Sequence, residues 1–213
     1  MSRVAAAQAT VKKKSIHATE RDTERVQKLR AEFRETVEGL DLARLKFVDE
    51  SGTNLAMTRL YGRATPGHRV VDAVPNNHGG NHTLVAALGV DGVSAPWIVE
   101  GAVTGDLFRL WVREVLAPTL HPGDIVLWDN LPAHKVAGIE ELIIARGAQL
   151  IRLAPYSPDF NPIERCWSKI KTYLRQAKAR TVEALLEAIK QALATITDAD
   201  IHGWFAHCGY PVH

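Results

Sequence analysis

Short apolar runs that end in polar residues recur through the middle of the chain and predict buried strands. We expect strands at 45–50, 82–89, 94–99, 125–128 and 149–154. The second and third of these runs are separated by Asp91-Gly92, a dipeptide that favours a tight turn, so they should form a hairpin.

Apolar residues spaced three and four apart predict helices over much of the remaining chain. We expect helices from Thr19 to about Gly39 and over 106–116, 139–146, 161–178 and 182–196. Thr19 is the expected N-cap of the first helix, and the segment 1–18, which has no period, is expected to be an arm. Strands followed by alternating strands and helices indicate a mixed α/β domain.

Composition excludes several other classes of protein. The chain has 213 residues, of which 46% are apolar and 23% charged, values that are ordinary for a globular domain. Its longest apolar run, Leu84–Val90, is far shorter than the roughly 20 residues of a membrane span. It opens with no apolar segment of a secretory signal, and its two cysteines fit a reducing compartment. We therefore expect a soluble, intracellular domain.

The net charge of +2 hides two basic segments around an acidic body. Residues 1–46 carry 11 Lys/Arg against 7 Asp/Glu, and residues 152–180 carry 7 against 2. Such segregation fits a polyanionic partner, with some of the acidic residues serving as metal ligands. Basic helices that simply face solvent would explain the same numbers equally well.

Three carboxylates stand where the predicted elements could bring them together. Asp49 and Asp129 each follow an apolar strand, and Glu164 lies in the first turn of a helix after a proline-rich loop. Clustered carboxylates repel one another unless cations neutralise them, and oxygen ligands favour Mg²⁺ or Mn²⁺. The alternative is local: an Asp after a strand is a common turn residue, and Asn161, Pro162 and Glu164 fit a helix capping box.

Three sequence blocks add a resemblance to this pattern. Residues 47–52 (FVDESG), 127–134 (LWDNLPAH) and 156–164 (YSPDFNPIE) resemble the conserved blocks of DDE transposases of bacterial insertion sequences, in the branch related to mariner elements. The 34 residues between Asp129 and Glu164 are also similar to the spacing in that branch. The resemblance implies a ribonuclease H-like mixed sheet flanked by helices over 44–213, preceded by a basic arm and linker helix over 1–43. It further implies that Asp49, Asp129 and Glu164 are the catalytic triad and hold two Mg²⁺ or Mn²⁺ ions.

Basic residues near this triad are candidates for DNA contacts. Counting from Glu164 at helical spacing gives Lys171, Arg175 and Lys178, a basic stripe that could follow a phosphate backbone. His134 and Lys135, just after Asp129, match a position where the family often has His, and could touch a phosphate. A solvated helix face and a surface loop are the alternative interpretations.

The expected function is cleavage of DNA at element ends and transfer of the 3′ end into target DNA, by an enzyme of the bacterial cytoplasm and nucleoid. The resemblance implies that a full transposase of this kind has a helix-turn-helix region joined to the catalytic domain. Only about 40 residues precede Asp49 here. We therefore expect that a separate or frameshift-fused helix-turn-helix subunit supplies that region, with a homodimer left open and no membrane partner. The alternatives are a ribonuclease H-like nuclease without joining activity and an inactive, DNA-binding transposase remnant.

Overall fold

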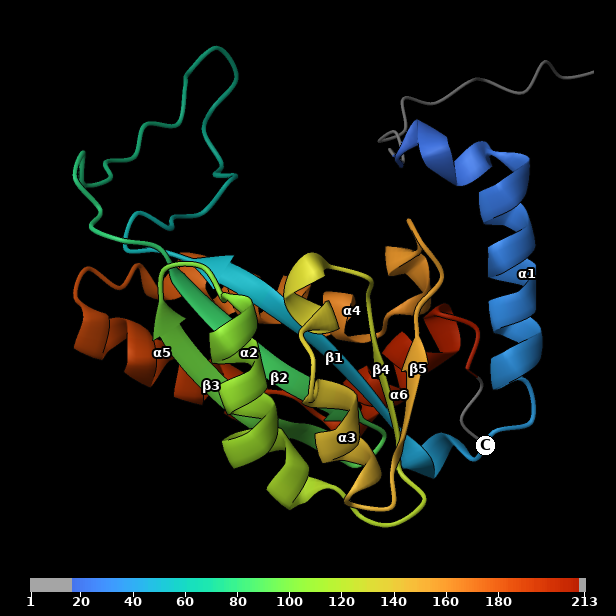
Figure 1. Ribbon diagram of the computed structural model, residues 1–213. Coiled ribbons are helices and arrows are strands. Elements are labelled where there is room, and N and C mark those ends of the chain that lie inside the picture. The colour runs from blue at the N-terminus through green and yellow to red at the C-terminus, as the bar shows by residue number, and fades with distance from the viewer. Residues whose placement is uncertain (1–16, 211–213) are drawn as a thin grey trace, which may run out of the picture.

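A five-stranded mixed sheet organises the chain, whose computed structural model describes residues 17–210 (Figure 1). The strands, in spatial order, are β3 (Gly92–Glu100), β2 (His82–Gly89), β1 (Leu45–Thr53), β4 (Ile125–Trp128) and β5 (Gln149–Arg152). The first three are antiparallel neighbours, whereas β4 and β5 run parallel to β1. The predicted strands and the hairpin between β2 and β3 are therefore present, within a few residues of their expected ends.

Helices cover both faces of the sheet. Figure 1 shows α2 and α3 in front of the sheet and α4, α5 and α6 behind it, with α1 alongside. The α-helices are α1 (Glu24–Val37), α2 (Gly105–Trp111), α3 (Ile139–Ile144), α4 (Ile163–Ala177), α5 (Val182–Ala194) and α6 (Asp198–His207). A π-helical segment, Val112–Leu116, extends α2, and short 3-10 turns lie at Thr19–Asp22, Leu42–Arg44, Ala117–Thr119, Pro132–Lys135 and Pro158–Phe160. Of the described chain, no helix has both the length and the apolar character that crossing a bilayer requires.

Alternating side chains along the strands build two separate apolar cores. Phe47 and Leu127 belong to the core under α1, α4, α5 and α6, whereas Val48 and Trp128 belong to the core under α2 and α3. Successive residues of a strand point to opposite faces, so this alternation fixes which face each following residue uses. Asp49 accordingly lies on the α4 face and Glu50 on the α2 face.

Three expectations about element boundaries are corrected. The α-helix of the first segment begins at Glu24 after a 3-10 turn, with Thr23 and not Thr19 as its N-cap. Strand β1 continues past Asp49 to Thr53, because its antiparallel pairing with β2 extends over that whole stretch. Helix α6, which begins with a capping box formed by Thr197 and Asp200, was not expected. Most of the expected arm at 1–18 lies outside the described residues, and the boundary at residue 43 stays a prediction.

Candidate active site

Strand register brings Asp49 and Asp129 to the same edge of the sheet. The parallel pairing of β1 with β4 matches Leu45 to Ile125 and Phe47 to Leu127. The same register, continued by two residues, places Asp49 opposite Asp129, the residue directly after β4. Both side chains line one cavity of about 420 Å³. The expectation that the two strands set these carboxylates side by side is thus consistent with the fold.

Glu164 reaches the same cavity from the first turn of α4. Pro162 occupies the N-cap position, and no side chain caps the helix, so the capping-box alternative is wrong. Within the described residues the carboxylate of Glu164 makes no hydrogen bond and is exposed. The rest of the wall comes from the ends of β4 and β5 and from the proline-rich loop: Asn130, Leu131, Leu153, Ala154, Pro155, Tyr156, Ser157, Pro158 and Asn161.

Burial and mutual repulsion make it costly to charge two of these carboxylates. Burial, followed by the negative charge of Glu164, raises the pKa of Asp49 from 3.8 to about 7. The indole Nε1 of Trp167 donates to Asp49 Oδ2 at 3.0 Å and opposes this shift. Although Glu164 is exposed at the cavity mouth, partial desolvation by the surrounding wall raises the pKa of its carboxyl, opposed by the Lys171 ammonium and assisted by the charge of Asp129. A cation among these groups would remove the repulsion.

Asp129 differs because a histidine holds it. Burial alone raises the pKa of Asp129, but contacts from His134 and from the Leu131 N–H outweigh it, and the net pKa is lowered. Nδ1 of His134 lies 2.7 Å from Asp129 Oδ1, and Nε2 lies 2.8 Å from Glu50 Oε1. Burial alone would lower the pKa of His134, but the two carboxylates raise it to about 9. His134 has no exposed side-chain surface, so the expected contact of this residue with DNA phosphate is wrong.

The carboxylate set fits divalent metal ions in its chemistry. Among residues 17–210, no three acidic, histidine or cysteine side chains already converge on one point as a metal site would require. Two of the oxygens are turned aside, Asp49 Oδ2 toward Trp167 and Asp129 Oδ1 toward His134 and the Leu131 N–H. All three residues nevertheless line one cavity as oxygen donors, the type that Mg²⁺ and Mn²⁺ prefer. The raised pKa values of Asp49 and Glu164 mark where a cation would relieve repulsion.

A buried arginine that the sequence analysis overlooked anchors the loop before Glu164. Arg30 of α1 donates to Ser157 Oγ at 2.5 Å and to both carboxylate oxygens of Asp159, and Arg21 adds a further bond to Asp159. In the same loop Tyr156 has a φ of 54°, in the left-handed region that non-glycine residues seldom adopt. The signal in the sequence was the position of Arg30, four residues after Val26 and three before Phe33, which places it on the apolar face of the helix.

The expected basic stripe is only partly available. Lys171 and Arg175 are half-buried on α4 and, within the described residues, form no ion pair. Lys178 lies past the last turn in a left-handed conformation, and its ammonium binds Asp72 of the β1–β2 loop at 2.6 Å. Lys135 is exposed and, within the described residues, forms no ion pair. The structure therefore keeps three of these four cations free for a phosphate backbone.

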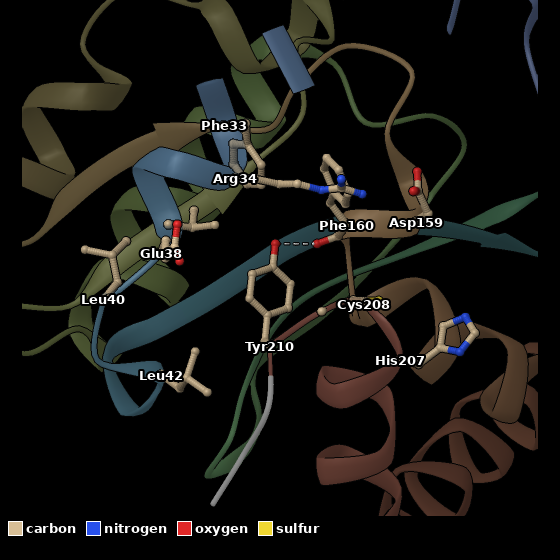
Figure 2. Close-up of a pocket in the computed structure, with 13 residues that line it drawn as sticks. Phe33, Arg34, Glu38, Leu40, Leu42, Asp159, Phe160, His207, Cys208 and Tyr210 are labelled. Carbon is tan, nitrogen blue, oxygen red and sulfur yellow. Dashed lines mark hydrogen bonds between the residues drawn. The ribbon is translucent and has the colours of Figure 1, made fainter. Parts of the chain in front are cut away.

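A second and larger cavity, of about 820 Å³, contains none of the three carboxylates. It lies between α1 and the segment after α6, and Figure 2 shows Phe33, Arg34, Phe160 and Tyr210 around it. The Tyr210 hydroxyl donates to the Phe160 carbonyl at 2.9 Å, and the Arg34 guanidinium lies 4.8 Å from the Phe160 ring centre. These contacts brace the far side of the loop before Glu164. Donor chemistry, not volume, identifies the smaller cavity as the candidate active site.

Comparison with known proteins adds the family. Residues 44–186, about two thirds of the chain, match the family described as DDE superfamily endonuclease. The chain belongs to this family. No curated protein matches the chain.

Solved structures with the same fold include those of Mos1 transposase. The Mos1 transposase paired-end complex with left transposon end is 19% identical with a TM-score of 0.73, over 98% of this chain and 64% of that chain. The Mos1 mariner paired end complex with Mg is 18% identical with a TM-score of 0.72, over 97% and 66%. The Mos1 transposase catalytic domain with Raltegravir and Mg is 15% identical with a TM-score of 0.65, over 91% and 94%.

These matches confirm the predicted ribonuclease H-like fold and the predicted DDE family, whereas an origin in a bacterial insertion sequence stays a prediction. The chain spans about two thirds of the longer Mos1 chains and nearly the whole length of the Mos1 catalytic domain. By family it is therefore a DDE superfamily endonuclease, and its fold is similar to that of the Mos1 transposase catalytic domain. Its reaction with DNA and its use of metal ions have to be argued from its own residues.

Proposed function

We propose that this chain catalyses metal-dependent cleavage of a DNA strand and transfer of the resulting 3′ end into target DNA. The observation that carries the proposal is the meeting of Asp49, Asp129 and Glu164 on one cavity, from two parallel strands and a helix. We assign these three residues as the catalytic, metal-holding set. Double-stranded DNA, as element end and as target, is the proposed substrate.

Two Mg²⁺ or Mn²⁺ ions held by these carboxylates would activate the attacking oxygen and stabilise the leaving oxygen of a phosphodiester. The protein's part is to present and orient the ligands. The Trp167 indole fixes one oxygen of Asp49, and the Leu131 N–H and His134 fix one oxygen of Asp129. The remaining oxygen of each carboxylate is left for the cavity.

The surface beside the cavity supplies positive charge for DNA. Lys171 lies close enough to Glu164 to lower the pKa of that carboxyl, and Arg175 follows one turn later along α4. Their ammonium and guanidinium groups can neutralise phosphates without reading bases. We therefore propose that duplex DNA runs along α4 toward the carboxylates, and that the exposed Lys135 adds a phosphate contact. Lys178, which is held by Asp72, contributes less.

Partner subunits belong to the same proposal. The Mos1 structures are paired-end, pre-cleavage and strand transfer complexes of that protein. By analogy we propose that this chain acts with a helix-turn-helix region, fused or separate, that reads the element ends. Action as a homodimer and in the bacterial nucleoid are the corresponding proposals for assembly and place.

A strand-transfer assay tests the proposed function. Duplexes carrying the pre-cut ends of the element that encodes the chain are mixed with a plasmid target and Mg²⁺, with the Asp129→Asn variant as control. Joined products that form with the wild-type chain and not with Asp129→Asn support the proposal. Cleavage without joining would indicate a nuclease, and binding with neither reaction would indicate an inactive remnant.

A further inference from the structure

His134 occupies an unusual position between two carboxylates that lie on different strands. Its Nε2 is 2.8 Å from Glu50 of β1, and its Nδ1 is 2.7 Å from Asp129 at the end of β4. Glu50 follows Asp49 directly but points to the other face of the sheet. The imidazole therefore connects the two strand ends that carry the proposed metal ligands, from the side away from α4.

The surroundings hold the imidazole rigidly. Its ring centre lies 4.2 Å from that of Phe108, and Trp128 packs beside it. The backbone carbonyl of His134 accepts a hydrogen bond from Arg152 Nη1 at 3.1 Å. With a fixed ring plane and a fixed backbone, His134 can position whatever its two nitrogens touch.

The side chains of His134, Glu50 and Asp129 differ in how far solvent can reach them. The side chain of His134 is 0% exposed and that of Glu50 only 14%, whereas Asp129 is 41% exposed toward the cavity. DNA and solvent ions can reach Asp129 but not the histidine. The most direct route from His134 to the cavity therefore runs through Asp129.

Both protein contacts of Asp129 fall on the same oxygen. The Leu131 N–H donates to Oδ1 at 2.9 Å, and His134 Nδ1 lies 2.7 Å from Oδ1 in an ion-pair contact whose angle is outside hydrogen-bond geometry. Oδ2 has no hydrogen-bond partner among the described residues. A carboxylate held by one oxygen presents the other in a fixed direction, which is how partners behind a metal ligand raise affinity.

We propose that His134, oriented by Glu50, is a positioning residue that aims Asp129 Oδ2 at a divalent cation in the active-site cavity. The proposal deepens the function proposed above and rests on Asp129 being a metal ligand. The Trp167 contact with Asp49 is its counterpart on the opposite face of the sheet. Glu50 and His134 thus join the site although neither touches the cation.

Metal binding without DNA tests this role separately from catalysis. The full chain is titrated with Mn²⁺ alone, and free Mn²⁺ is followed by electron paramagnetic resonance. The His134→Gln variant should bind Mn²⁺ roughly 10- to 100-fold more weakly than wild type. Glu50→Gln keeps an acceptor oxygen but loses the charge, so it should weaken binding less.

A matched control removes a histidine that also lies beside an aspartate. His121 is 78% exposed, 3.8 Å from Asp124, at the start of β4 and far along the strand from Asp129. His121→Gln should bind Mn²⁺ as wild type does. Cleavage by His134→Gln should recover at saturating Mn²⁺, whereas cleavage by Asp129→Asn should not, a difference that mere loss of folding would not produce.

Two results would overturn the inference in distinguishable ways. Mn²⁺ affinity of His134→Gln equal to wild type would remove the positioning role and leave the proposed function standing. Absence of Mn²⁺ binding by wild type would overturn the metal-dependent function and this role together. If circular dichroism shows that His134→Gln is unfolded, Glu50→Gln decides: unchanged affinity in that variant refutes the proposal, and weakened affinity supports it.

Discussion

The Arg30 guanidinium donates hydrogen bonds to both carboxylate oxygens of Asp159, at 3.0 and 2.7 Å, across 129 residues of sequence. Its third bond, to Ser157 Oγ, reaches a residue that lines the active-site cavity. The ring of Phe160 lies 4.1 Å under the same guanidinium. Helix α1 therefore fixes the loop that delivers Glu164, and it should influence catalysis from outside the site.

Replacing Arg30 with Ala should destabilise the protein by about 2 kcal/mol, because it leaves Asp159 and Ser157 without their buried partner. Cleavage should fall as well, since the loop before Glu164 loses its anchor. Urea unfolding measures the first effect and a cleavage assay the second. Arg25→Ala, an exposed position on the same helix, is the control. Equal stability of the two variants would show that the contacts of Arg30 with Asp159 and Ser157 contribute nothing to the free energy of unfolding.

The variants Asp49→Asn, Asp129→Asn and Glu164→Gln should each abolish metal-dependent cleavage while leaving the fold intact. Each removes a charge that a divalent cation needs and keeps the size of the side chain. Circular dichroism checks the fold, and cleavage of end-labelled duplex checks activity. Asp106→Asn, on an exposed side chain of α2, should retain full activity. Full activity in any one of the first three would exclude that residue from the site.

Without metal, the charge on Asp49 should make stability depend on pH. Its pKa is about 7 in the folded protein against an ordinary 3.8, so between these values the folded state binds more protons than the unfolded state. The free energy of unfolding should therefore fall as pH rises from about 4 to 7. Asp49→Asn cannot ionise and should be roughly 2 kcal/mol more stable than wild type at pH 8 in chelator. If the stability of the two proteins changed with pH in the same way, the raised pKa of the Asp49 carboxyl would be refuted.

Metal identity should separate binding from turnover. Mg²⁺ and Mn²⁺ should support cleavage, whereas Ca²⁺, with its larger and looser coordination, should allow binding with little turnover. Excess chelator should abolish cleavage by the wild-type chain and leave its fold unchanged. Product formation that persists in chelator would rule out the metal-dependent mechanism.

DNA binding by the chain alone should be weak and strongly dependent on salt, because the basic residues of α4 meet phosphates and not bases. The double variant Lys171→Ala/Arg175→Ala should weaken binding to all duplexes alike and flatten the salt dependence by about one unit per lost contact. Lys178→Ala should have a smaller effect, since Asp72 already neutralises that ammonium. Fluorescence anisotropy across a salt series, with terminal-repeat and scrambled duplexes, checks all three. Tight, salt-insensitive preference for the terminal repeat would contradict this account.

Local patterns predicted the sheet and marked the three carboxylates as candidates, and the resemblance to DDE transposases then gave them a role. Apolar runs marked all five strands, and Asp49 and Asp129 are the residues that directly follow the apolar runs 45–48 and 125–128. The sequence could not show that β1 continues to Thr53, since that length depends on pairing with β2, which lies almost thirty residues later. It likewise missed α6, whose apolar residues are few and lie among polar ones.

Long-range polar contacts were the part of the site that sequence reasoning could not reach. His134 was expected to touch a DNA phosphate or to lie in a surface loop, yet Phe108 and Trp128 pack against it. Arg30 and Asp159 are ordinary surface types in local windows, and only the packing of α1 against the proline-rich loop pairs them. Burial of a charged side chain is decided by what arrives from elsewhere in the chain.

The adjacency of Asp49 and Glu50 on one strand restricts how this gene can change. A one-residue insertion between Leu45 and Asp49 would exchange the two faces, turning Glu50 toward Trp167 and the cavity and Asp49 toward His134. By contrast, the stretch 54–81, which Figure 1 shows leading away from the sheet, can lengthen or shorten without shifting that frame. Length variation among descendants of this sequence should therefore accumulate after Thr53 and be purged before Asp49.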